Sequence, residues 1–126
     1  MKKKYLIYLF LILGCTNNPQ RKQNYRLSSD TIDFINLPYR DTLNKIIYLQ
    51  NESDSLLYVK KIETECGCTA VQIKDSLVKP GDSTPIQIRY VPSAANDTGN
   101  IMKFITFRVN SVPTFVNVTI KGKILR

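Results

Sequence analysis

Hydrophobic and polar residues alternate with a period of two along much of the chain after residue 30, which is the pattern of half-buried β-strands. The clearest case is residues 84–91, where Ile86, Ile88 and Tyr90 face one way and Gln87 and Arg89 face the other. Turn-forming residues separate such segments at intervals of about ten residues. The pattern predicts about seven strands, at residues 31–37, 42–50, 56–64, 70–73, 84–91, 101–109 and 114–121.

A turn between two of these segments has a clear chemical signature. In Lys79-Pro80-Gly81-Asp82, proline suits the first central position of a β-turn and glycine the second. No segment offers an amphipathic helix of ten or more residues. Short strands joined by turns therefore predict an all-β chain, a single antiparallel β-sandwich over residues 30–126. An antibody-type core is excluded, because there is no tryptophan and Cys66 and Cys68 are too close in sequence to bridge facing sheets.

The N-terminus has the pattern of a secretory signal. Lys2, Lys3 and Lys4 precede an uncharged apolar run at residues 5–13. This run is shorter than the roughly 20 apolar residues that span a bilayer. Residues 1–14 are therefore predicted to be a signal peptide; the alternative is a buried N-terminal helix or strand.

The end of that run, Ile12-Leu13-Gly14-Cys15, resembles the lipobox of bacterial lipoproteins. The resemblance implies that Cys15 is acylated, becomes the mature N-terminus and anchors the protein to a membrane. Thr16 follows in place of an aspartate, and by the same resemblance this favours the outer membrane of the cell envelope.

Residues 15–29 are polar and lack apolar periodicity, which predicts a flexible tether after the lipidated cysteine. The alternative is a first edge strand at residues 25–27. The domain organisation expected is thus signal peptide, tether and sandwich.

Charge adds little to this picture. The formal net charge is +8, and it falls to +5 when Lys2, Lys3 and Lys4 leave with the signal. The other cations are scattered among the strands, without a basic run interleaved with aromatic residues, so nucleic-acid binding is not predicted. The expected partners are a membrane, through the lipid anchor, and another envelope protein.

A series of short motifs recurs in a definite order along the predicted sandwich. The motifs are Asp33-Phe34, Tyr48-x-x-Asn51, Cys66-Gly67-Cys68-Thr69, Pro80-Gly81-Asp82, Gly99, Asn110 and Gly122. This order resembles a bacterial family of unknown function, the CGCT-motif family numbered fifteen seventy-three, over about residues 30–125. The resemblance implies an immunoglobulin-like fold related to major-sperm-protein and Hydin-type domains, and it brings no activity. Ile35 departs from the family pattern, which often has glycine there.

The Cys66-Gly67-Cys68 stretch has three interpretations, which the sequence leaves open. In a regular strand the Cα atoms two residues apart are about 6.5 to 7 Å apart, long for a disulfide, but Gly67 would permit a bend that brings the sulfurs together. A bridge over so small a ring is strained and easily reduced, which favours a redox role. The structural alternative is a turn, with or without a bridge, in which both cysteines act as small apolar residues.

A metal site is the third interpretation. Two thiolates suit Cu(I), which accepts a nearly linear pair of sulfur ligands. Zinc needs four ligands, and the chain has no histidine, so carboxylates such as Glu63 and Glu65 or a second copy would have to complete the site.

Other chemistry is sparse. Without histidine no Ser–His or Cys–His pair exists, and the five glycines are too dispersed to form a phosphate-binding loop. An enzyme is therefore not expected. The leading hypothesis is a non-enzymatic envelope lipoprotein that binds a partner; the rival hypothesis is a thiol-redox or Cu(I)-handling protein.

Overall fold

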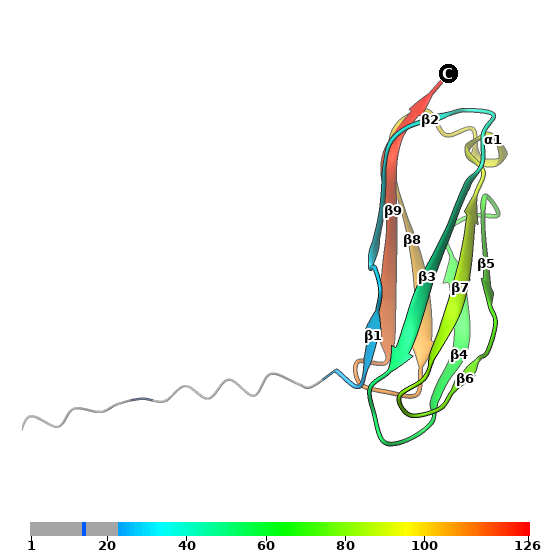
Figure 1. Cartoon of the computed structure of the whole chain (residues 1–126). Coiled ribbons are helices and arrows are strands. Elements are labelled where there is room, and N and C mark those ends of the chain that lie inside the picture. Colours follow the sequence, from blue (N-terminus) through cyan, green and yellow to red (C-terminus); the bar gives the residue numbers. More distant parts are fainter. Residues whose placement is uncertain (1–13, 15–22) are drawn as a thin grey trace, which may run out of the picture.

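Strand β7 (Ser83–Tyr90) shows how the sequence pattern builds the core. Ile86, Ile88 and Tyr90 are completely buried, whereas Gln87 and Arg89 are exposed on the opposite side. The computed structural model describes Gly14 and residues 23–126. Between residues 23 and 126 a pair of sheets packs face to face (Figure 1). The predicted β-sandwich is confirmed.

Each sheet places alternate side chains in the space between them. The four-stranded sheet has the order β1 (Tyr25–Leu27), β3 (Leu43–Asn51), β7, β5 (Thr69–Ile73). The five-stranded sheet has the order β2 (Thr31–Pro38), β9 (Phe115–Leu125), β8 (Gly99–Val109), β4 (Leu57–Thr64), β6 (Leu77–Val78). The core is filled by buried aliphatic and aromatic residues from both sheets, which removes a large apolar area from water.

The seven predicted strands are all present, and residues 23–126 contain two further short ones, β1 and β6. The predicted loop at residues 92–100 contains a one-turn helix, α1 (Pro92–Ala95), and the start of β8. Strand β9 continues to Leu125, four residues past its predicted end.

Strand β1 lies within the segment predicted to be a tether. Tyr25 is 4% exposed, and its hydroxyl donates to the carbonyl of Pro113 at 2.8 Å. The residues on either side of Tyr25 are polar, so no hydrophobic periodicity marks β1 in the sequence. The alternative, an edge strand at residues 25–27, is the one observed, and the folded region begins five residues before the predicted boundary at residue 30.

One strand pair departs from the predicted antiparallel arrangement. The chain crosses from the four-stranded to the five-stranded sheet between β1 and β2, and β2 then runs parallel to β9, with Thr31 beside Thr119. The register shifts at Ile35, which is 88% exposed. The position where this chain departs from the family pattern is therefore a β-bulge.

The two ends of the sandwich carry different features. The N-terminal segment enters at the end that holds the turn before β7 and the β8–β9 turn. The Cys66–Cys68 turn and α1 lie at the opposite end, with the C-terminus (Figure 1). The eight residues of β7 between these ends span about 24 Å.

Candidate functional site

Cys66 and Cys68 lie in the turn that connects β4 in one sheet with β5 in the other, and their sulfurs form a disulfide. Their Cα atoms are 5.2 Å apart, closer than residues two apart in a regular strand. The bend required by the sequence analysis is therefore present. Closing so short a loop restricts the unfolded chain only slightly. The loop-closure relation gives a stabilisation of the folded state of less than about 2 kcal/mol.

The two cysteines differ in exposure. Cys68 is 3% exposed and belongs to the core, whereas Cys66 is half-buried between the exposed residues Glu65 and Gly67. The Sγ atom of Cys68 lies 3.7 Å from the hydroxyl of Thr69, which is also buried. Cys66 is thus the more exposed of the two residues, although it also packs against the core.

Backbone hydrogen bonds hold this turn independently of the sulfurs. The Thr69 N–H donates to the Cys66 carbonyl at 3.4 Å, and the Thr64 hydroxyl donates to the same carbonyl at 3.2 Å. The Val91 N–H donates to the Cys68 carbonyl at 2.8 Å and joins the turn to the end of β7.

Gly67 occupies the turn as predicted, but neither of the usual reasons for glycine applies. Its φ is not in the left-handed region, and an added Cβ would meet no atom within 4 Å. Gly81 is different, because its φ is +80° and the Asp82 N–H donates to the Lys79 carbonyl at 3.0 Å. The predicted Pro80–Gly81 turn is confirmed, with glycine at the position that needs positive φ.

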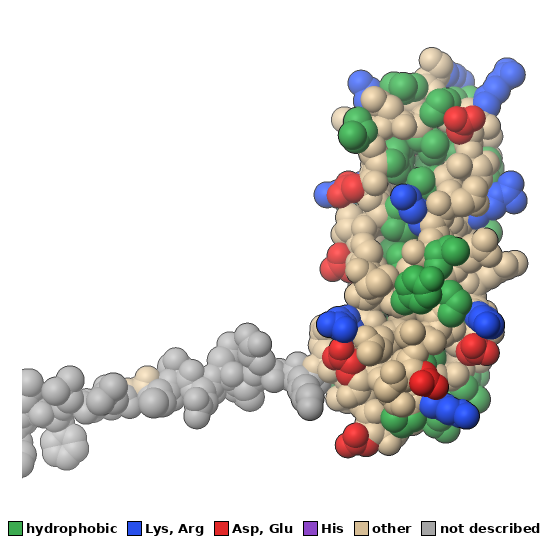
Figure 2. Space-filling view, in the orientation of Figure 1, with side chains coloured by type: hydrophobic (Ala, Val, Ile, Leu, Met, Phe, Trp, Pro, Cys, Tyr) green, Lys and Arg blue, Asp and Glu red, His purple; other side chains and the backbone are tan. Residues whose placement is uncertain are grey.

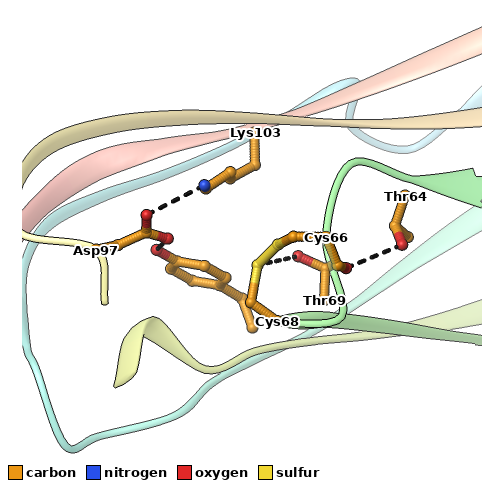
Figure 3. The surroundings of a disulfide bond; sticks show 7 residues. Thr64, Cys66, Cys68, Thr69, Asp97 and Lys103 are labelled. Carbon is orange, nitrogen blue, oxygen red and sulfur yellow. Dashed lines mark hydrogen bonds and ion pairs between the residues drawn. A yellow bond between two sulfur atoms is a disulfide. The ribbon is translucent and has the colours of Figure 1, made fainter. Parts of the chain in front are cut away.

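A polar chain lies near the disulfide and was not found from the sequence. The Tyr90 hydroxyl donates to the Asp97 carboxylate at 2.6 Å, and Lys103 Nζ lies 3.1 Å from the other carboxylate oxygen. Figure 3 shows Asp97 and Lys103 in the surroundings of the Cys66–Cys68 turn. Burial, and secondarily the hydrogen bond to Asp97 and its charge, raise the pKa of Tyr90 above its ordinary value.

This chain satisfies polar groups at the end of the core. Lys103 points inward from β8, and its side chain and that of Asp97 are 20% and 14% exposed. A charge so placed needs a partner, which Asp97 provides. The arrangement is a sufficient structural explanation for all three side chains.

The disulfide bears directly on the metal interpretation. Sulfurs bonded to each other offer no thiolate, which is the form that binds a metal. A Cu(I) site would therefore require the reduced turn. Among Gly14 and residues 23–126, no group of three or more Cys, Asp and Glu side chains is placed to hold an ion.

Strand β5, which follows the disulfide, has an unpaired edge. The Cys68 carbonyl accepts from Val91 and the Lys74 N–H donates to Pro85, both on the β7 side. Because alternate residues of an antiparallel strand bond to the same neighbour, the even-numbered residues between them also point their N–H and C=O groups at β7. The N–H and C=O groups of Val71 and Ile73 point away from β7, toward the edge. In Figure 1, β5 lies at the margin of the sandwich.

The outer face of the four-stranded sheet is partly apolar. Ile46 and Tyr48 of β3 are 57% and 49% exposed, and Figure 2 shows a hydrophobic patch part-way along this strand. A shallow pocket of about 450 Å³ reaches from Ile46 to β5, where Gln72 and Lys74 line it. The patch and the free edge are therefore connected.

The predicted lipid site, Cys15, lies outside the described residues, and its acylation stays a prediction. From residue 23 onward, and at Gly14, no helix has the length and apolar character needed to cross a membrane.

Comparisons with known proteins place this geometry in a class. A Porphyromonas gingivalis W83 protein of unknown function is similar over 85% of this chain and 51% of its own, with a TM-score of 0.71 and 20% identity. This chain thus spans about half the length of that protein. The PapD-like domain 7 of human CEP192 gives a TM-score of 0.62 at 10% identity, covering 100% of this chain and 97% of that domain. The Caenorhabditis elegans major-sperm-protein family member WR4 gives a TM-score of 0.56 at 13% identity, covering 82% of this chain and 99% of WR4.

These similarities define an immunoglobulin-like sandwich of the major-sperm-protein and PapD type, which confirms the predicted fold class. The family model for proteins of unknown function named DUF1573 matches residues 25–124, so the chain belongs to this family. The match starts at Tyr25, the first residue of β1. No curated protein matches the chain.

Proposed function

We propose that the protein is a lipoprotein of the cell envelope, anchored through Cys15, whose sandwich binds an extended segment of another envelope protein as an added strand beside β5. The observation that carries this proposal is the free edge of β5. An extended peptide can pair with such an edge through main-chain hydrogen bonds, while pockets for alternate side chains give specificity.

The four sheet edges of the described region differ in how well they are protected. Strands β1 and β6 are only three and two residues long, so beside them residues 43–47 of β3 and residues 60–64 of β4 are also unpaired on one side. Strand β2 is interrupted by the bulge at Ile35 and ends at Pro38. Strand β5 pairs with β7 over five residues without a register shift, and neither bulge nor proline protects its outer edge.

The side chains around this edge indicate what a bound segment would look like. On its core-facing side, Val71 and Ile73 of β5 and Ile62 of β4 are half-buried and pack against the core. Apolar side chains of a guest strand would complete their burial. On its outer side, Lys74 and Arg89 are exposed.

The charges on the outer face of the four-stranded sheet determine which charge a bound segment should carry. Across the described four-stranded sheet, from β1 to β5, the outward-facing residues include no Asp or Glu. A guest strand with apolar residues on one face and acidic residues on the other therefore complements the edge on both sides.

The proposed anchor would orient this edge. The chain enters the sandwich at the end opposite the Cys66–Cys68 turn, so the start of β5 lies about 24 Å along the sandwich from the point where the chain enters. With Thr16 after the lipidated cysteine, the outer membrane is the proposed location. An edge held away from the membrane is accessible to a partner in the envelope.

Site-specific photo-crosslinking in native cells tests the proposal. A photoreactive residue replaces Gln72 on β5, and in a matched chain it replaces Asn117 on the outer face of β9; both side chains are exposed. The expected result is one major adduct from position 72 and not from position 117. Its linked peptide should alternate apolar and acidic residues.

Two variants decide whether the adduct reports strand addition. Val71→Pro removes an N–H that points to the edge without breaking the β5–β7 ladder, and should abolish the adduct. Lys74→Glu should weaken it, whereas Lys123→Glu on the other sheet should not. An adduct that persists in folded Val71→Pro protein and is undiminished in Lys74→Glu contradicts the proposal.

A further inference from the structure

The Cys66–Cys68 disulfide has a chemistry that strand addition beside β5 does not use. We propose that it is a thiol–disulfide exchange site, which a dithiol protein attacks at Cys66 and in which Cys68 is the leaving sulfur. The proposal does not depend on the binding function, because it rests on the turn itself.

Exposure determines which sulfur is attacked. A thiolate must reach the disulfide along the line of the sulfur–sulfur bond, from the side opposite the leaving sulfur. Cys66 is half-buried and flanked by the exposed residues Glu65 and Gly67, whereas Cys68 is 3% exposed. Cys66 is therefore the more accessible of the two residues to a thiolate that arrives from solvent, whereas Cys68 is covered by the core.

The leaving sulfur has a hydrogen-bond donor in place. The Thr69 hydroxyl lies 3.7 Å from Cys68 Sγ and can donate to the thiolate that forms there. A donor to the charged form favours that form, which makes Cys68 the better leaving group. Lys103, the cation in these surroundings, is already paired with Asp97 (Figure 3).

The turn keeps its backbone contacts when the bridge opens. The Cys66 carbonyl accepts from Thr69 and Thr64, and the Cys68 carbonyl accepts from Val91, and none of these bonds involves a sulfur. Exchange therefore requires no unfolding of the sandwich, and the short covalent loop contributes little to holding it together.

Exchange proceeds through a mixed disulfide between Cys66 and the partner. A partner thiolate bonds to Cys66 Sγ, the Cys66–Cys68 bond breaks, and its electron pair leaves on Cys68 Sγ, which then takes up a proton. The partner's second thiolate attacks the partner sulfur of the mixed disulfide and releases Cys66 as a thiolate, which takes up the second proton. In total the partner dithiol is oxidised to a disulfide and Cys66 and Cys68 are reduced to thiols, with two electrons and two protons transferred.

A trapping experiment tests the assignment. The full chain carries Cys15→Ser, so that Cys66 and Cys68 are its only cysteines. The probe is a thioredoxin-class protein whose resolving cysteine is replaced by serine, so the mixed disulfide accumulates. The expected product is a one-to-one adduct that peptide mapping places on Cys66. An adduct on Cys68, or none with the folded chain when the urea-unfolded chain reacts, overturns the proposal.

Two matched pairs of variants sharpen the test. The thiol of Cys66 in the Cys68→Ser chain should react with iodoacetamide at least tenfold faster than the thiol of Cys68 in the Cys66→Ser chain; equal rates contradict the assignment. Thr69→Val should slow formation of the adduct several-fold, whereas Thr64→Val, which removes a hydroxyl bonded only to a carbonyl, should not. Equal slowing by both variants contradicts the role of Thr69.

Val71→Pro separates this proposal from the binding function. The variant should lose the partner at β5 and keep the wild-type trapping rate at Cys66. In the wild-type chain, trapping at Cys66 without a partner at β5 contradicts only the proposed binding function, and binding at β5 without trapping contradicts only the exchange proposal.

Discussion

Asn51 is a completely buried polar residue whose side chain makes every hydrogen bond its position allows. Its amide nitrogen donates to the carbonyls of Ser55 at 2.7 Å and Val78 at 2.8 Å. Its amide oxygen accepts from the backbone N–H and the hydroxyl of Ser53. Asn51 therefore ties the turn after β3 to β6, and its place in the family motif has a structural explanation.

Replacing Asn51 with alanine should lower the free energy of unfolding by about 2 kcal/mol or more, because the buried bond to the carbonyl of Val78 is lost. Asn110→Ala is the matched control. Its exposed side chain makes similar bonds to the carbonyl of Leu56 and the N–H of Tyr58, and its loss should cost about 1 kcal/mol. Urea unfolding measures both, and equal losses would contradict the role given to burial.

Tyr90 makes stability depend on pH in the alkaline range. Its pKa is raised in the folded chain, so its contribution is complete below the unfolded value of about 10 and is lost as pH rises toward the folded value. Burial of Tyr25 raises its pKa and acts in the same direction. Because the folded chain holds these phenol protons more tightly than the unfolded chain does, the free energy of unfolding should fall as pH rises through about 10 and above.

In the Tyr90→Phe variant, the free energy of unfolding should fall less as pH rises above about 10, as measured by urea unfolding at several pH values. Tyr58→Phe, at an exposed position, should keep the wild-type fall. If Tyr90→Phe and the wild type lose stability in parallel, Tyr90 is not the group responsible.

Among the elements, the parallel pairing of β2 with β9 depends on one glycine. Gly122 lies opposite Phe34, and a Cβ added there would overlap the carbonyl oxygen and the ring of Phe34. The Phe34 ring also packs near Tyr90, with the ring centroids 6.5 Å apart. Glycine is required at this position by close approach and not by its φ angle.

Gly122→Ala should therefore destabilise the protein by about 1–3 kcal/mol, the usual cost of overpacking. Gly67→Ala is the control and should stay within about 0.5 kcal/mol of the wild type, since its added methyl meets nothing. Thermal unfolding compares the two. A large loss from Gly67→Ala would mean that the turn needs glycine after all.

The sequence predicted those elements whose side chains alternate over many residues. Strands such as β7 and β8 follow directly from the period-two pattern, because one face is buried and the other is exposed. Strands β1 and β6 are too short for any period, and only the burial of Tyr25 and Val78 marks them. The parallel pairing of β2 depends on where the chain changes sheets, which no local pattern encodes.

At the scale of the whole molecule, the sequence located one half of the candidate site. The Cys-Gly-Cys motif was visible because its residue types are rare in this chain. The free edge of β5 was not, since an edge is defined by which strands are absent beside it, a non-local property. The Tyr90–Asp97–Lys103 chain joins residues from three segments and likewise had no sequence signal.

The fold brings the disulfide and the free edge together at the end of the sandwich opposite the N-terminal segment (Figure 1). Cys68 is the residue immediately before β5, so a partner that reduces the bridge and a partner that pairs with the edge would approach neighbouring surfaces. Their effects remain separable, because Val71 and Cys66 can be changed independently.

Hydrogen exchange at the amides of Val71 and Ile73 tests strand addition most directly. A synthetic peptide of the segment cross-linked at position 72 is added to the protein, and exchange is followed residue by residue. Both amides point away from β7, and pairing with a guest strand should slow their exchange at least about tenfold while the exposed amides of β2 are unchanged. If the peptide binds but these two amides exchange as fast as they do in the protein without peptide, the account is contradicted.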